Sequence, residues 1–349
     1  MNEKKKNLIE NEERNKGYTS LISSISVLLE DARQRVYTEV NQILVKTYWQ
    51  IGRSIVEFEQ RGEERAEYGS RLLDNLSCDL TGKYGRGFSM DNLEKMRKFY
   101  LLFSKSETLS RKLSWSHYCL IIRLDNKLAR DFYTIEVEKE NWSVSELDRQ
   151  VNSILFERIA LSRDKKGVLE LAKKGHLIER AEDLIKNPYV LEFLGLEESV
   201  RYTETQLEQK IIDNLQKFLL ELGKGFAFVS RQQRITLEDE HFYIDLVFYN
   251  RLLRCFVIVE LKIGKLTHKD LGQLRMYVHY YDRKIKQEDE NLTVGILLCA
   301  DKKDAIVKYT LPEGNKQIFA SKYKLYLPEK KILEERVRII LDIEGDGKK

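Results

Sequence analysis

Hydrophobic residues in the first half of the chain recur every three or four positions. This helical period continues without any stretch of strand-like alternation. Ser89 is expected to cap a helix that continues to about Phe103. Ser143 and Glu146 have the spacing of a capping box at the last helix of this half. The pattern predicts an all-helical N-terminal domain over residues 18–162.

The pattern changes after a charged junction over residues 163–199, which contains the turn signal Asn187-Pro188. A helix is predicted from Glu204 to Leu222, and Gly223 is suited to end it. Three strands, a helix, two strands and a terminal helix are expected after it, over residues 226–237, 242–249, 253–262, 267–281, 292–300, 317–327 and 329–341. This order is typical of an α/β domain in which helices cover a sheet, here over residues 200–343.

Composition restricts the class of protein. No stretch approaches the ~20 apolar residues that a membrane-spanning helix needs, so no membrane association is expected. The four cysteines form no CxxC pair, which argues against a disulfide framework and indicates a cytoplasmic protein. The first residues lack the apolar segment of a signal peptide. No Walker A motif is present, so the chain is not expected to hydrolyse ATP.

Positive charge is concentrated in one part of the helical half. The whole chain has a formal net charge of +4, which permits a polyanionic partner without requiring one. Residues 83–112 alone hold eight basic and three acidic residues, a net of +5. Lys83, Arg86, Lys95 and Lys98 are therefore candidates for contacts with nucleic-acid phosphates. A solvated helix face would have the same composition, so that interpretation stays open.

The candidate chemistry lies on two neighbouring predicted strands. Strand alternation places Asp245 on one face and both Ile244 and Leu246 on the other. On the next strand, Glu260 and Lys262 are two residues apart and share a face. The sequence therefore predicts two carboxylates and a lysine in one region of the sheet.

The pairing of these strands decides how close the carboxylates lie. If Arg251-Leu252 closes the hairpin, opposite residues have numbers that sum to 503, and Asp245 faces Ile258. Glu260 is then one diagonal step away from Asp245, at roughly 7–8 Å between Cβ atoms. Two carboxylates at this separation can bind a single divalent cation.

The hydrophobic run before Glu260 is typical of a strand buried on both faces. A buried carboxylate needs a cation, which could be Lys262, a metal ion or both. The alternative is an edge hairpin whose Glu–Lys pair faces solvent.

Three further polar residues have a spacing that suits the same site. Glu208 lies on the apolar stripe of the predicted helix at 204–222, so it either reaches inward to this cluster or interacts with the helix dipole. Gln273 and Tyr277 are four residues apart and share a helix face. They could orient a metal-bound water or a phosphate, or belong to a solvated surface.

These residues together resemble the PD-(D/E)XK nuclease superfamily, and the whole chain resembles its YhcG-like family. Ile244 stands where the superfamily's name has a proline, a departure that removes no ligand. The resemblance spans residues 20–340 and is closest in the segments 48–52, 87–93, 96–100, 113–117, 187–195, 207–225, 242–262 and 272–277. It implies an all-helical N-terminal domain followed by a restriction-endonuclease-like α/β domain, with a mixed central sheet flanked by helices.

The resemblance also implies roles for the site residues. Glu208, Asp245 and Glu260 would hold Mg²⁺, for which Mn²⁺ could substitute, with the Leu261 carbonyl as a further ligand. Lys262 would place the attacking water and stabilise charge on the scissile phosphate, and Gln273 and Tyr277 would complete the pocket.

The expected function is a metal-dependent DNA endonuclease whose helical domain recruits DNA or forms a homo-oligomer. The alternatives are a non-catalytic DNA-binding scaffold, or the same chemistry on RNA or branched DNA.

Overall fold

The computed structural model describes residues 3–60, 71–105, 109–196, 202–302, 304–327 and 329–342. The chain forms two compact units. Unit 1 comprises Met1–Asp125 with Val137–Val144, and unit 2 comprises Asn126–Glu136 with Ser145–Lys349. No helix in the described part of the chain is long and apolar enough to cross a membrane.

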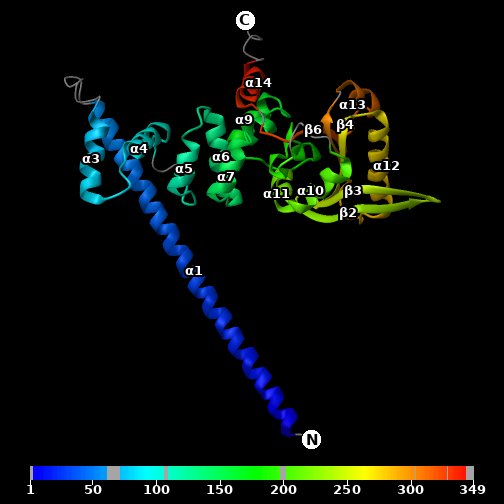
Figure 1. The fold of residues 1–349 in the computed structure, drawn as a ribbon, viewed down its shortest axis with the longest axis horizontal. Coiled ribbons are helices and arrows are strands. Elements are labelled where there is room, and N and C mark those ends of the chain that lie inside the picture. Colours follow the sequence, from blue (N-terminus) through cyan, green and yellow to red (C-terminus); the bar gives the residue numbers. More distant parts are fainter. Residues whose placement is uncertain are drawn as a thin grey trace. The chain divides into compact units, whose positions relative to one another are not determined.

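Unit 1 is built from helices, as the periodicity predicts (Figure 1). Its main elements are α1 (Glu3–Gln60), α3 (Leu72–Tyr84), α4 (Met90–Leu102) and α5 (Trp115–Ile121). Ser89 caps α4 by accepting a hydrogen bond from the Asn92 amide, which confirms the predicted start of this helix. Gly52 of α1 lies against the Met96 carbonyl of α4, and a Cβ atom at this position would overlap it. The glycine therefore permits the close contact between the two helices.

Helices also make up the first part of unit 2. They are α6 (Lys127–Glu140), whose last turn belongs to unit 1, α7 (Val144–Asn152), α8 (Leu155–Ala160) and α9 (Lys165–Lys174). α14 (Lys330–Asp342) packs on α8 and α9. The buried Arg158 of α8 forms an ion pair with the buried Glu221. Residues 145–162 and the segment predicted as a junction therefore pack with the sheet, so the units divide earlier than residue 162.

A six-stranded mixed sheet forms the centre of unit 2. The strand order is β1-β6-β5-β4-β3-β2. β2 with β3 and β3 with β4 pair antiparallel, whereas β4 with β5, β5 with β6 and β1 with β6 pair parallel. The strands are β1 (Tyr189–Val190), β2 (Phe226–Leu237), β3 (Glu240–Asn250), β4 (Cys255–Lys265), β5 (Val294–Asp301) and β6 (Ile318–Lys324). The expected restriction-endonuclease-like arrangement of a mixed sheet with flanking helices is confirmed.

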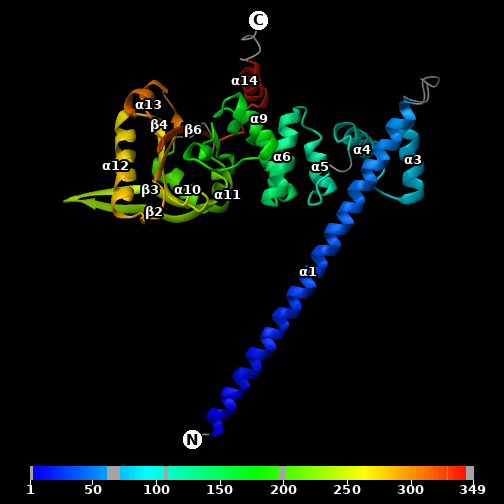
Figure 2. The same ribbon diagram turned by 180° about the vertical axis from the view of Figure 1, so that it is seen from behind.

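Helices cover both faces of this sheet (Figures 1 and 2). On one face, α10 (Glu204–Asp213) and α11 (Leu215–Leu222) pack on a core that includes Phe248 and Val259. On the other face, α12 (His268–Lys284) and α13 (Asp304–Thr310) pack on Ile258 and Cys299. The central strands β4 and β5 are thus buried on both sides over most of their length.

One predicted helix is two helices in the structure. The chain between Glu204 and Leu222 breaks at Asn214, whose backbone leaves the helical region at φ −120° and ψ 31°. The Asn214 side chain also donates a hydrogen bond to the Lys210 carbonyl, a local contact that competes with helix continuation. The apolar stripe is nearly continuous across the break, which explains why the periodicity predicts a single helix.

Candidate active site

The turn between β3 and β4 sets the register of the carboxylates. Asn250 ends β3, and its side-chain oxygen accepts hydrogen bonds from the Leu252 and Leu253 amides, each at 3.1 Å. The turn therefore spans residues 251–254. Paired residues have numbers that sum to 505, as in Leu246 with Val259.

The predicted sum of 503 is wrong because it assumes a two-residue turn. In the observed register, the position opposite Asp245 is that of Glu260, one step beyond the last paired residues. Hydrogen bonds between each carboxylate and the backbone of the other strand bring the two residues together, in a register that differs from the predicted one.

The alternation of β3 also shifts at Asp245. Ile244 packs into the core beneath α12, whereas Leu246 packs into the core beneath α10 and α11. The expectation that these two residues share a face is wrong, because β3 changes its side-chain alternation at the intervening residue. The irregularity lies at the predicted catalytic position.

Asp245 and Glu260 are linked through each other's backbone. The Asp245 amide donates to Glu260 Oε1 at 3.0 Å, and the Leu261 amide donates to Asp245 Oδ2 at 2.9 Å. Burial, reinforced by the Glu208 charge, raises the pKa of Asp245 to about 6. Burial and the charge of Asp245 raise the pKa of Glu260 to about 9. The pair therefore lacks compensating positive charge.

Glu208 reaches the cluster from α10, as the inward-facing interpretation expects. Its side chain is 2% exposed. Gln232 Nε2 joins it to the strand pair by donating both to Glu208 Oε2, at 2.6 Å, and to Asp245 Oδ1, at 3.1 Å. Arg231 Nε lies 3.3 Å from Glu208 Oε1. The third carboxylate is thus connected to Asp245 through an amide.

Sequence reasoning missed Gln232. It belongs to a polar stretch of β2 that has no regular alternation, and its backbone has a φ of +44°, which is rare for a non-glycine residue. The β2–β3 ladder shifts register between Phe228 and Ser230, just before it. The sequence signal for a site residue on β2 is its run of polar residues, which lies opposite Asp245. Nothing in the local sequence distinguishes Gln232 from Gln233.

Lys262 lies beside the cluster but pairs with other acids. Its Nζ is 3.1 Å from Glu204 Oε1 and 3.6 Å from Asp270 Oδ1, and its side chain is 32% exposed. Burial lowers the pKa of Lys262, but the hydrogen bond and charge of Glu204 outweigh this and raise it. Among the described residues, Lys262 is therefore held charged by Glu204 and Asp270, which sequence reasoning did not assign to the site.

Gln273 and Tyr277 are joined on α12. Thr267 caps this helix in a capping box with Asp270, as predicted. Gln273 Nε2 donates to the Tyr277 hydroxyl at 2.6 Å, and that hydroxyl donates to the Tyr243 carbonyl at 3.1 Å. Tyr277 is fully buried. The two residues thus contact the backbone of β3 two positions before Asp245.

The donor atoms of the cluster suit a hard divalent cation. Glu208 Oε1 is buried and accepts no hydrogen bond, although Arg231 Nε lies 3.3 Å away, and burial is the main cause of the raised pKa values of Asp245 and Glu260. Carboxylate oxygens are the ligands that Mg²⁺ prefers. Across the described residues, however, no three acidic, histidine or cysteine side chains have a separation that suits one ion. The Gln232 amide lies between Glu208 and Asp245.

The four predicted nucleic-acid contacts belong to unit 1. Lys83 lies over the Tyr84 ring at the end of α3, and Arg86 is exposed in the following loop. Lys98 is exposed on α4, whereas Lys95 forms an ion pair with Asp91. Three of the four side chains therefore face solvent.

Several solved structures resemble part of the chain. A crystal structure of a repair endonuclease from Pyrococcus abyssi has 19% sequence identity and a TM-score of 0.26, over 38% of this chain and 50% of that one. A structure titled "EndoMS-dsDNA2 complex" has 16% identity and a TM-score of 0.26, over 39% of this chain and 51% of that one. This chain therefore spans about half the length of each.

Two family models and one curated protein match far more of the chain. Residues 24–158 match the DUF1016 N-terminal domain, and residues 182–338 match the YhcG PDDEXK nuclease domain. The chain is 39% identical over 355 residues to "Putative nuclease YhcG" of Escherichia coli (strain K12), covering 92% of this chain and 94% of that protein. The chain therefore belongs to the YhcG family, in which a DUF1016 N-terminal domain precedes a PDDEXK nuclease domain.

Proposed function

We propose that this protein is a metal-dependent endonuclease that hydrolyses phosphodiester bonds in DNA. The observation that carries the proposal is the pair of carboxylates, half-buried Asp245 and buried Glu260, each of which accepts a hydrogen bond from the backbone of the other's strand, with Lys262 two residues beyond Glu260 on β4. A scaffold has no physical need for uncompensated buried acids, since each costs folding free energy. Membership in a family with a PDDEXK nuclease domain supports the same conclusion.

Each residue has a role in this proposal. Asp245, Glu260 and Glu208 would hold Mg²⁺ or Mn²⁺, with the Leu261 carbonyl as a further ligand. Such an ion, when bound, lowers the pKa of water and offsets charge on a phosphate. Lys262 donates to the scissile phosphate and to the attacking water, and its pairing with Glu204 and Asp270 keeps it protonated. Gln273 and Tyr277 complete the pocket by fixing the β3 backbone.

The helical N-terminal domain is proposed to recruit DNA through Lys83, Arg86, Lys95 and Lys98. Each phosphate contact releases counterions, so affinity depends on salt concentration. The charge reversals K95E and K98E should weaken binding to all DNA sequences and reduce the salt slope by about one for each lost contact. K139E, a reversal of an exposed lysine elsewhere in unit 1, is the control.

A cleavage assay on the purified full chain tests the chemistry. Linear, supercoiled and branched DNA and RNA are each incubated with Mg²⁺, with Mn²⁺ and with EDTA. We expect cleavage of DNA that requires the ion and disappears in D245N purified in the same way. Cleavage of RNA or branched DNA alone would keep the chemistry and correct the substrate. No cleavage of any substrate, or equal cleavage by D245N, would overturn the proposal.

A further inference from the structure

The N-terminal part of α1 presents an apolar stripe that no described residue of unit 1 covers. Its large side chains are between 40% and 68% exposed, among them Tyr18, Ile22, Leu29, Val36 and Ile43. In Figure 1, this part of α1 extends beyond the other helices of unit 1. The seven large apolar side chains on this line expose on the order of 700 Å², more than the 300–600 Å² patch of a typical monomer. They are Tyr18, Ile22, Ile25, Leu29, Val36, Val40 and Ile43.

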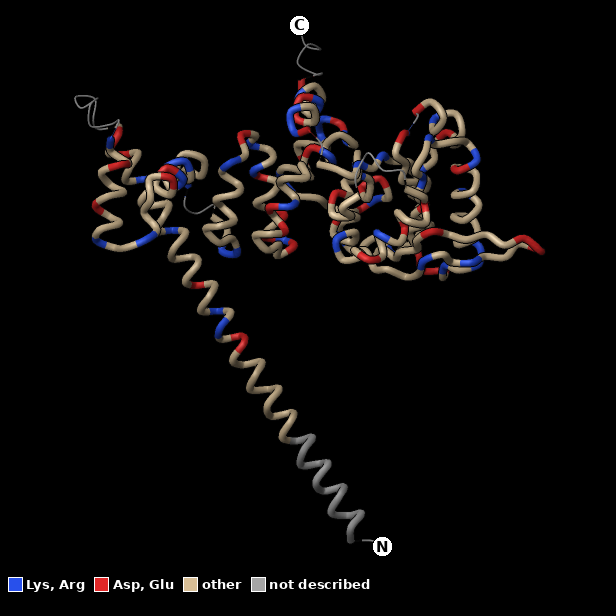
Figure 3. The backbone as a smooth tube through the Cα atoms, viewed as in Figure 1, with Lys and Arg blue, Asp and Glu red and all other residues tan. Residues whose placement is uncertain are grey.

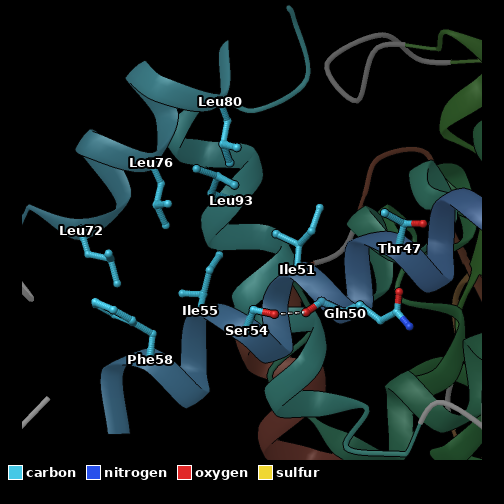
Figure 4. A pocket seen from close by; sticks show the side chains of 10 residues that line it. All are labelled: Thr47, Gln50, Ile51, Ser54, Ile55, Phe58, Leu72, Leu76, Leu80 and Leu93. Atoms are coloured by element: carbon cyan, nitrogen blue, oxygen red, sulfur yellow. Dashed lines mark hydrogen bonds between the residues drawn. The ribbon is translucent and has the colours of Figure 1, made fainter. Parts of the chain in front are cut away.

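The same face of α1 continues into an apolar groove. Eighteen residues make five helical turns, so Tyr18, Val36 and Ser54 lie on one line along the helix. Ser54 lines a groove of about 470 Å³ between α1 and α3, with Ile51 and Phe58 on the same wall. Figure 4 shows Ile55 and Phe58 on the side of α1 nearest the α3 residues Leu72 and Leu76, whereas the Ser54 hydroxyl donates to the Gln50 carbonyl. The opposite face of α1, with Val45 and Trp49, is buried in unit 1.

The groove and one segment of the stripe match in length and in charge. The groove occupies residues 47–58 of α1, and none of its lining residues is charged. Residues 18–29 of α1 also number twelve and include no charged residue, as the tan colour of this segment in Figure 3 shows. Both segments belong to the continuous helix α1. In an antiparallel pair that sets residue 18 of one copy opposite residue 58 of the other, residue 29 lies opposite residue 47, so the numbers of facing residues sum to 76.

We infer that two copies of this chain pair their α1 helices antiparallel, so that residues 18–29 of each copy occupy the groove of the other. A two-fold axis near residue 38 places the apolar segment of each copy in the groove of the other. Both grooves are then filled, and the interface is closed and isologous. In this register Tyr18 lies opposite Phe58, Ile22 opposite Ser54 and Val36 opposite Val40 of the second copy. A parallel pair would leave both grooves open. A foreign helix in the groove would leave the stripe exposed.

The expected area is sufficient for a stable dimer. Stable interfaces bury about 800 Å² on each partner, and the stripe alone provides surface on this order. Arg35 and Glu39 flank the stripe with opposite charges, so its edges are not uniformly repulsive. The inference concerns α1 alone and does not depend on the nuclease chemistry.

The first test is the mass of the purified full chain in solution, measured by light scattering over a dilution series. We expect a dimer of the 41.3 kDa chain. L29E in the stripe and S54R in the groove should each produce monomers. V27E is the matched control, because Val27 is 68% exposed but lies on the opposite side of α1. A monomeric wild type, or equal dissociation in L29E and V27E, would overturn the inference.

Cross-linking tests the direction of pairing. Ile22 and Ser54 are separated by 32 residues, or about 48 Å along one helix, too far for a short cross-linker within one chain. In a C78S background, the double variant I22C/S54C should form covalent dimers with a short bismaleimide. The single variants I22C and S54C should not. Efficient dimers from either single variant would overturn the antiparallel arrangement, and unchanged helicity by circular dichroism would verify that each variant is folded.

Discussion

Unit 2 contains two buried clusters of charge that differ in their balance. In the first cluster, the Glu221 carboxylate accepts hydrogen bonds from Arg158 and from the Val190 amide, and Lys186 donates to the Glu221 backbone carbonyl. Burial alone would raise the pKa of Glu221, but the charges of Arg158 and Lys186 outweigh it and lower that pKa. In the second, burial raises the pKa values of both Asp245 and Glu260.

The difference separates a cluster that the fold balances internally from the cluster that we propose to be catalytic. Glu221 and Arg158 are both fully buried, and each satisfies the other within the fold. Asp245 and Glu260 accept hydrogen bonds from two backbone amides and from Gln232 Nε2, and both pKa values are raised, so neither carboxylate is compensated as Glu221 is. Perturbed pKa values occur in both clusters, so burial alone does not distinguish them. The distinguishing feature is the direction of the shift, which is downward for Glu221 and upward for Asp245 and Glu260.

The largest effect is expected from breaking the balanced cluster. R158A leaves Glu221 buried without its main partner and should destabilise unit 2 by about 3–5 kcal/mol. The measurement is the free energy of unfolding in urea. The double variant R158L/E221L removes both charges and should recover much of this loss. Equal stability of R158A and wild type would show that the cluster is not the structural element described here.

The next effect is on catalysis. K262A should reduce cleavage by ~10²–10³-fold, because it removes positive charge from the scissile phosphate. Stabilisation of the protein by Mg²⁺, measured as a thermal shift, should persist in K262A and disappear in D245N. Neither variant should unfold the protein as R158A does. If K262A cleaves as well as wild type, the lysine has no part in the reaction.

A smaller effect is expected at Gln232, which holds Glu208 and Asp245 through a single amide group. Q232A should shift the Mg²⁺ concentration for half-maximal cleavage upward by roughly 10–100-fold, as the loss of an orienting partner does in metal sites. Q233A is the matched neighbour and should leave this midpoint unchanged.

The positive φ of Gln232 adds a second measurement. Q232G should be more stable than Q232A by about 1 kcal/mol or more, because glycine adopts this backbone conformation without strain and alanine does not. A midpoint that moves equally in Q232A and Q233A would exclude a positioning role for Gln232.

The sequence predicted the parts of the site that lie in regular patterns. Asp245 and Glu260 are recognisable because each interrupts an apolar strand, where a carboxylate requires a partner to offset the cost of its burial. Gln232 follows a register shift, and its conformation has no local sequence signal. Arg158 and Glu221 are 63 residues apart, so only the folded chain brings them together. The periodicity of the sequence therefore does not predict contacts that depend on tertiary packing.

The smallest effect is the pH dependence of stability, which differs in sign between the two clusters. The folded-state pKa of Glu260, about 9, lies above its value in the unfolded chain. The folded protein therefore binds more protons, and its stability falls as pH rises from about 4 towards 9. Glu221 has a lowered pKa, so its contribution is present above the unfolded pKa and is lost as pH falls through the folded one.

Urea unfolding at a series of pH values in EDTA separates these contributions. E260Q should remove part of the decline in stability between about pH 4 and pH 9 and leave the loss of stability below pH 4 unchanged. E221Q should change the acid side and leave the alkaline decline in place. If the free energies of unfolding of wild type and E260Q change in parallel above pH 6, Glu260 is ionised in the folded protein without a bound cation. The contrast between the two clusters would then be wrong.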